Sequence, residues 1–128
     1  MSGPMKGYIY LAVPYSHKDP VVRMHRYHSV CLAAAKLMEM GYVIFSPITH
    51  TIPIESYVQE ELKQDHSFWM EQDLPILAKA SGLFILTLPG WKTSSGVQEE
   101  IEFAQEHHIP YQCVSYKDCL KKRIVWEY

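Results

Sequence analysis

Gly82-Leu83-Phe84-Ile85-Leu86-Thr87-Leu88 is the clearest buried strand of the sequence and decides the expected fold. Its apolar residues follow one another almost without a break, as in a strand that is covered on both faces. A turn-rich loop follows at residues 89–96, and from Val97 to His107 the apolar positions recur with a helical period. This order of strand, loop and helix is typical of an α/β protein with a parallel sheet.

Two strands and a long helix are predicted before this stretch. Residues 7–13 and 42–45 are short apolar runs bounded by turn residues. Between them, residues 20–40 carry apolar side chains at intervals of three and four, and Asp19-Pro20 supplies a typical helix start. The chain therefore begins with a strand, a helix and a second strand.

The middle and the end of the chain are less regular. Residues 48–64 show no clear period and contain Pro53, so we expect a long loop with about one helical turn. Residues 67–80 are predicted to form a helix that Pro75 kinks or interrupts. The last predicted elements are a strand and a short helix, at residues 110–115 and 117–122.

Helices between successive strands imply parallel strands joined by right-handed crossovers. We expect a single α/β domain over residues 1–128, with three α/β/α layers and an open parallel sheet of four to five strands, flavodoxin-like or Rossmann-like. Such sheets bind ligands beyond the carboxyl ends of the strands, where the strand order reverses. Three segments are expected to meet there: residues 13–18, 46–51 and 89–96.

The composition excludes several classes of function. Apolar residues make up 48% and charged residues 20% of the chain, which is ordinary globular usage. A net charge of -2 gives no basic face for a nucleic acid polymer. No apolar run approaches the roughly 18 residues of a membrane span, and the three cysteines have no CxxC spacing. We expect reduced thiols, a cytoplasmic location and no membrane partner.

Glu100 is the first candidate for chemistry. In a helix that begins near Gly96, the residues Val97, Ile101 and Ala104 form one stripe, and Glu100 lies beside it. A carboxylate in the first turn is favoured in its ionised form by the helix dipole. An ionised carboxylate that faces a cleft is what a nucleophile or general base requires. The same position also suits an acidic residue that only stabilises the helix start.

Asp73 and Tyr10 are further candidates. Asp73 precedes Pro75 by two residues, and a helix break there would expose its carboxylate towards the cleft. Two neighbouring carboxyl groups can divide the roles of nucleophile and acid. The hydroxyl of Tyr10, on the first strand, is able to orient a carboxylate. The alternatives are a solvated Asp73 and a Tyr10 that only packs in the core.

The loop Thr93-Ser94-Ser95-Gly96 opens directly into a helix. Its free N–H groups and hydroxyls suit an anion or a sugar hydroxyl, although serine and glycine are also ordinary helix caps. Trp69 and Trp91 are aromatic candidates, either for stacking on a nucleobase or for packing. The seven histidines lack partners at metal-ligand spacing, so we expect no metal and no cofactor.

Several stretches resemble the nucleoside 2-deoxyribosyltransferase superfamily, which includes deoxynucleoside 5'-monophosphate N-glycosidases. They are residues 9–15 (IYLAVPY), Asp73 on a helix before an apolar strand, and residues 95–104 (SGVQEEIEFA). The stretches YLAVPYSH, FSPITH and LPGWKTSSGVQEEIEFA resemble more closely an uncharacterised bacterial branch, known as a domain of unknown function. The resemblance to this branch covers nearly the whole chain.

The resemblance implies roles for the residues that match. Glu100 matches the nucleophile that attacks the anomeric carbon, Asp73 the acid that binds and protonates the base, and Tyr10 the tyrosine that positions the nucleophile. Ser94 stands where the transferases carry an aspartate. Contacts to the substrate are expected from Tyr15, Ser16, His50, Trp91, Ser94, Ser95 and Gly96.

The implied function is cleavage of the N-glycosidic bond of a nucleoside or nucleotide, a small molecule. Water as the acceptor gives a hydrolase and a second base gives a transferase. The resemblance also implies a homodimer or homotetramer. Two alternatives stay open: a non-catalytic module that binds a nucleotide or nucleotide sugar, and an interaction domain whose aromatic surface includes Trp91.

Overall fold

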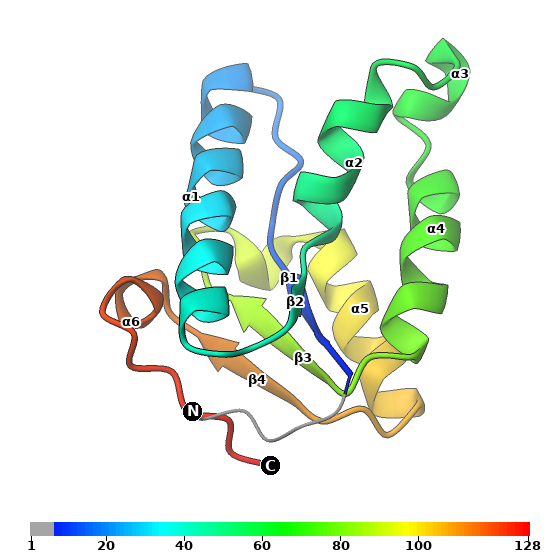
Figure 1. Cartoon of the computed structure of the whole chain (residues 1–128). Coiled ribbons are helices and arrows are strands. Elements are labelled where there is room, and N and C mark those ends of the chain that lie inside the picture. The colour runs from blue at the N-terminus through cyan, green and yellow to red at the C-terminus, as the bar shows by residue number, and fades with distance from the viewer. Residues whose placement is uncertain (1–6) are drawn as a thin grey trace.

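The computed structural model describes residues 7–128 and contains one sheet of four parallel strands (Figure 1). The spatial order is β2-β1-β3-β4, so β1 lies between the second and third strands of the sequence. The predicted α/β fold with an open parallel sheet is therefore confirmed. The strands are β1 (Ile9–Ala12), β2 (Ile44–Phe45), β3 (Gly82–Leu86) and β4 (Tyr111–Val114).

Helices cover both faces of this sheet (Figure 1). The helix α1 begins at Pro20, where the side chain of Asp19 accepts a hydrogen bond from the N–H of Val21, as expected for an N-cap. The helices are α1 (Pro20–Glu39), α2 (Pro47–Glu55), α3 (Glu60–Lys63), α4 (His66–Ala78), α5 (Ser95–Glu106) and α6 (Tyr116–Leu120), with a short 3-10 helix η1 (Trp91–Thr93).

The alternation of side chains along β1 divides the core into two parts. Ile9 and Leu11 pack with residues of α1 and α6 on one face. Tyr10 and Ala12 pack with residues of α4 and α5 on the other face. Because side chains of a strand alternate between the two faces, the position of Tyr10 in β1 directs its ring towards α5.

The strand order reverses beside β1. From β1 the chain passes to β2 on one side, and later to β3 on the other. The register pairs Tyr10 with Phe45 of β2 and with Leu83 of β3. The carboxyl ends of these strands therefore lie together, and the segments that follow them begin at the reversal point, as predicted.

The loop expected at residues 48–64 was wrong, and Pro75 does not interrupt its helix. Residues 47–55 form α2 and residues 60–63 form α3, where the sequence predicted a loop. Pro53 lies inside α2, and Pro75 lies inside α4 without interrupting it. Proline removes the bond to the carbonyl four residues earlier. For Pro75 this carbonyl belongs to Glu71, and both residues are exposed, so the carbonyl lies in a part of the helix that solvent can reach.

The remaining differences are shifts of a few residues at element ends, which are the least predictable feature of a helix or strand. One of them affects β2, which pairs only over Ile44–Phe45. Within residues 7–128, no helix has the length and apolar character needed to cross a membrane. The three cysteines are free thiols.

Candidate active site

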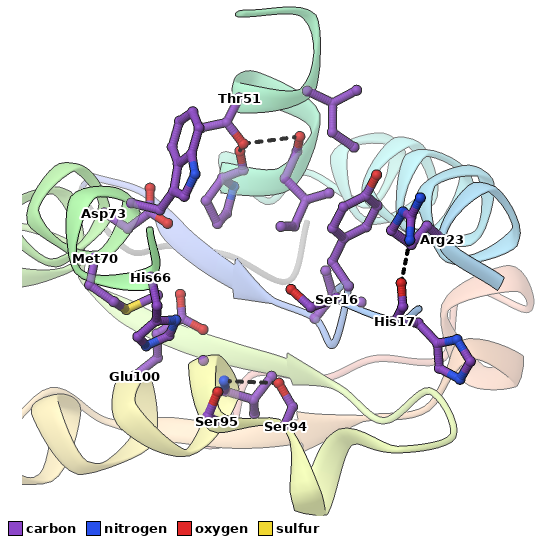
Figure 2. A pocket seen from close by; sticks show the side chains of 18 of the residues that line it. Ser16, His17, Arg23, Thr51, His66, Met70, Asp73, Ser94, Ser95 and Glu100 are labelled. Atoms are coloured by element: carbon purple, nitrogen blue, oxygen red, sulfur yellow. Dashed lines mark hydrogen bonds between the residues drawn. The ribbon is translucent and has the colours of Figure 1, made fainter. Parts of the chain in front are cut away.

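A cavity of about 500 Å³ lies beyond the carboxyl ends of β1 and β3 (Figure 2). The β1–α1 loop and the start of α1 form one side of it. The opposite side is formed by α4, and α2 and the start of α5 complete it. Figure 2 shows Asp73, His66 and Glu100 on one side, and Ser16, His17 and Arg23 across from them.

Glu100 lines this cavity and is bonded to Tyr10, which lies buried behind it. The hydroxyl of Tyr10 donates a hydrogen bond to Oε2 of Glu100. Tyr10 is completely buried and Glu100 is 5% exposed. Glu100 lies between the buried residues Val97 and Ala104 of α5, as its spacing predicted. Since α5 begins at Ser95, however, Glu100 lies in the second helical turn and not in the first.

Asp73 lines the same cavity from α4. Its side chain is inside the fold, since only 7% of the residue is exposed. The helix continues through Pro75, so no break exposes this carboxyl group, contrary to expectation. Asp73 reaches the cavity because its position on α4 faces the same core as Met70 and Leu77.

Burial changes the acidity of all three groups. Loss of hydration raises the pKa of Glu100 to about 8; the bond from Tyr10 opposes this shift and the charge of Asp73 adds to it. Burial also raises the pKa of Asp73 to about 6. The pKa of Tyr10 is raised as well, chiefly by burial, so its hydroxyl stays protonated and remains a donor. Between these two values the two carboxyl groups hold about one proton together.

The loop before α5 both caps the helix and lies at the cavity, the two roles that its sequence allowed. Oγ of Ser94 accepts a hydrogen bond from the N–H of Val97 at 3.3 Å, which caps the helix. Ser94, Ser95 and Gly96 also line the cavity. Ser95 is exposed, so its hydroxyl is accessible to a ligand.

The other predicted contact residues divide into two groups. Tyr15 and Ser16 line the cavity, whereas His50 and Trp91 do not. His50 is exposed, and its ring lies 5.5 Å from that of Phe45. Trp91 packs against the core on the α5 side and lines a separate hollow formed by residues 87–93. His50 and Trp91 are thus outside the cavity because their side chains point towards other parts of the fold.

Trp69 is a wall of the cavity. Its indole N–H donates to the carbonyl of Lys63 at 3.0 Å, which fixes the ring on α4. The sequence left open whether Trp69 stacks on a base or packs in the core, and the ring is placed where a flat ligand can reach it.

Sequence reasoning missed several polar residues of the cavity. One of them is His66, whose Nε2 lies 3.0 Å from Oε1 of Glu99. Arg23 donates to the carbonyl of His17. Arg23 lies in the first turn of the first helix, close to the reversal point of the sheet, and this signal was available in the sequence. His66 had no comparable signal, because the face of α4 was not fixed by its sequence.

The residues present suit acid–base and nucleophilic chemistry. Within residues 7–128, no three of the histidine, cysteine, aspartate and glutamate side chains are grouped as metal ligands. A buried carboxyl group held by a tyrosine, with a second carboxyl group in the same cavity, is an arrangement that can serve as a nucleophile and a proton donor.

Comparisons with known proteins agree with this architecture. The model of a family described as Domain of unknown function (DUF1937) matches residues 7–116. Among solved structures, a 2-deoxyribosyltransferase from the psychrotolerant bacterium Bacillus psychrosaccharolyticus is similar, with a TM-score of 0.62 and 21% identity over 85% of this chain and 72% of that chain. A search of curated proteins gave no match. The family model confirms the resemblance to a domain of unknown function, and the solved structure confirms a fold like that of a 2-deoxyribosyltransferase.

Proposed function

This chain belongs to the family described as Domain of unknown function (DUF1937), and from the site inside its 2-deoxyribosyltransferase-like fold we propose that it cleaves the N-glycosidic bond of a nucleoside or nucleotide. The observation that supports this most is that Asp73 and Glu100 line one cavity and that Tyr10, buried behind it, donates a hydrogen bond to Glu100. Glu100 is the proposed nucleophile, Asp73 the proton donor and Tyr10 the residue that holds the nucleophile in place.

In the first step, the Glu100 carboxylate attacks the anomeric carbon of the sugar. The bond from this carbon to the base nitrogen breaks, and its electron pair leaves with the base. The proton of the Asp73 carboxyl group passes to the base. The products of this step are a glycosyl ester on Glu100, the free neutral base and an ionised Asp73.

In the second step, a water molecule takes the place of the base. The Asp73 carboxylate accepts one proton of the water, and the oxygen attacks the anomeric carbon. The ester bond to Glu100 breaks and restores its carboxylate. The net reaction consumes one water and gives the free base and the sugar. A second base in place of water gives transfer.

The cavity suits a small ligand with one flat and one polar part. Its volume of about 500 Å³ lies within the usual range for small-molecule sites. Trp69 offers an aromatic wall for a base beside Asp73. Ser95 and Gly96 lie at the start of α5, where hydroxyl and N–H groups suit a sugar hydroxyl or a phosphate.

We propose at least a dimer for the working state. The helix α1 exposes large apolar side chains that no described residue covers, at Val21, Met24, Leu32 and Met38. Light scattering checks this proposal, and a monomer at micromolar concentration contradicts it.

The test is incubation of the protein with a panel of 2'-deoxynucleosides, ribonucleosides and their 5'-monophosphates, with measurement of the free base. We expect turnover of at least one compound and a loss of about a thousandfold or more in Glu100→Gln. Glu102→Gln is the matched control, because Glu102 is an exposed glutamate of the same helix. Adding a second base distinguishes transfer from hydrolysis.

Two outcomes contradict the proposal. The first is full turnover by Glu100→Gln. The second is tight binding of a nucleotide by both the native protein and Glu100→Gln with no release of base, which favours a binding module instead.

A further inference from the structure

Arg26 joins the two loops that flank the cavity. It lies on α1, and its Nη1 donates to the carbonyl of Ser16 at 3.0 Å. Its Nη2 donates to the carbonyl of Pro89 at 3.1 Å. Ser16 belongs to the β1–α1 loop, 10 residues before Arg26, and Pro89 to the segment between β3 and α5, 63 residues after it. One side chain therefore bridges two loops that are far apart in the sequence.

The neighbouring glycine is adapted to this bridge. Gly90 has φ 93°, a left-handed conformation that favours glycine. A Cβ atom at Gly90 would lie 2.8 Å from Nη2 of Arg26. The backbone thus approaches the guanidinium so closely that a side chain at Gly90 would displace it.

The guanidinium group of Arg26 donates to backbone carbonyls. Within residues 7–128, no ion pair involves this guanidinium. Its planar group presents several N–H donors at fixed angles, which suits two separate carbonyl acceptors. The ammonium group of a lysine is a compact point and lacks this geometry. Arginine at this position is therefore specific to the bridge.

Both bridged segments lead directly into the walls of the cavity. Ser16 itself lines it, together with Tyr15. The segment that begins at Pro89 continues through η1 to Ser94 and Ser95, which line the facing wall. Arg26 is absent from the lining and acts from behind these loops. Its two bonds connect the segments that lead into the two walls.

We propose that Arg26 is a positioning residue that fixes the spacing of the substrate-contacting loops. The proposal rests on the proposed function and adds a determinant of substrate affinity to it. Glu100, Asp73 and Tyr10 are carried by α5, α4 and β1, none of which Arg26 bonds. Loss of Arg26 therefore weakens the binding of substrate more than it slows the chemical step.

The experiment compares Arg26→Met, which keeps an apolar stem of similar length, with Arg26→Lys and with Arg123→Met. Arg123 is an exposed arginine outside the cavity and serves as the matched control. Hydrogen exchange of residues 14–19 and 87–96 is followed together with KM and kcat for the nucleoside that the panel identifies. In Arg26→Met we expect exchange to rise about tenfold in both segments, with KM raised about fivefold or more and kcat changed less than about threefold.

Arg26→Lys is expected to restore at most one of the two segments, because its ammonium reaches one carbonyl at a time. Gly90→Ala provides a second test. The added methyl group displaces Nη2 of Arg26, which bonds the carbonyl of Pro89, and should raise KM in the same way. Arg123→Met is expected to behave like the native protein.

Three results overturn the proposal. They are unchanged exchange in either segment of Arg26→Met, loosened segments with unchanged KM, and a uniform rise in exchange across the whole fold, which marks a merely structural role. If the native protein cleaves no nucleoside, the proposed function fails by itself. In that case the exchange of the two segments still decides whether Arg26 couples them.

Discussion

The hydroxyl of Tyr10 donates a hydrogen bond to Oε2 of Glu100, a residue 90 positions later in the chain. Tyr10 is fixed in β1, which lies inside the sheet, and Glu100 in a helix packed on that sheet. The bond therefore joins two rigid elements, and its donor keeps its proton because burial raises the pKa of the phenol. The carboxyl group of Glu100 is held in one orientation towards the cavity.

Tyr10→Phe should lower kcat by about 10- to 100-fold, because the phenylalanine no longer orients the carboxylate. The bond lowers the pKa of Glu100, so its loss should raise this pKa further and shift the alkaline limb of the pH profile upward. Steady-state kinetics across the pH range of the assay checks both effects.

Tyr42→Phe is the matched control for this variant. Tyr42 is buried on the other face of the sheet, where its hydroxyl donates to the carbonyl of Ile124 at 3.2 Å and accepts from the N–H of Trp126 at 3.0 Å. Its loss should cost about 1 kcal/mol or more of stability and leave kcat unchanged. Equal kinetics in Tyr10→Phe and the native protein would show that Tyr10 does not position Glu100.

The activity should follow a bell-shaped pH profile with limbs near the two carboxyl pKa values, about 6 and about 8. Between these limbs the pair carries one proton, which lies mainly on Glu100 because its pKa is the higher of the two. The reactive form is the minor one, in which the proton is on Asp73 and Glu100 is ionised. Below the lower limb both groups are protonated and the nucleophile is lost. Above the upper limb both are ionised and the acid is lost.

Asp73→Asn should change the shape of this profile. The variant has no second carboxyl group, so activity, about a hundredfold lower, should rise with pH and then level off. The pKa of Glu100 should fall, because the charge of Asp73 no longer raises it. An unchanged bell in Asp73→Asn would show that another group supplies the proton.

Glu100→Gln should stabilise the fold at alkaline pH. Burial raises the pKa of Glu100 from its ordinary 4.5 to about 8, so between these values the native state holds a proton that the unfolded chain has released. The free energy of unfolding therefore falls as pH rises through this window. The amide has no proton to lose and still accepts the bond from Tyr10. We expect a gain of roughly 2 kcal/mol or more near the upper end of the window and little near its lower end.

Urea unfolding at several pH values between these limits measures the difference. Glu102→Gln is again the control, since its side chain is exposed and its loss should not change the slope with pH. A constant difference between Glu100→Gln and the native protein across the window would mean that Glu100 is ionised in the folded state throughout.

The sequence predicted the sheet well because its strands are buried on both faces. A run such as residues 82–88 is short and almost entirely apolar, and a strand buried on both faces is the structure that fits such a run best. It failed at α2, whose start at Ser46 has no side-chain cap and which contains Pro53. Packing against α1 and β1 stabilises this helix, and such tertiary contacts leave no local pattern.

The candidate site was predictable where the position in an element fixes the direction of a side chain. Tyr10 and Glu100 are of this kind, since strand alternation and helical spacing place them on one face. His50 and Trp91 belong to segments that do reach the edge of the cavity, but the direction of a side chain in an irregular segment has no period to predict it. His66 and Glu99 pair across two helices whose relative rotation depends on packing.

Ser94 allows a last test, because the chain contains a second serine in the same structural role. Ser94 caps α5 through the N–H of Val97, and Ser115 caps α6 through the N–H of Asp118 at 3.1 Å. Ser94→Ala and Ser115→Ala should each cost about 1 kcal/mol of stability. Only Ser94 lines the cavity, so only Ser94→Ala should also raise KM, by about threefold to tenfold. If the two variants lose stability alike and neither changes KM, Ser94 is a helix cap only, and the sugar or phosphate must be bound by Ser95 and the N–H groups of α5 instead.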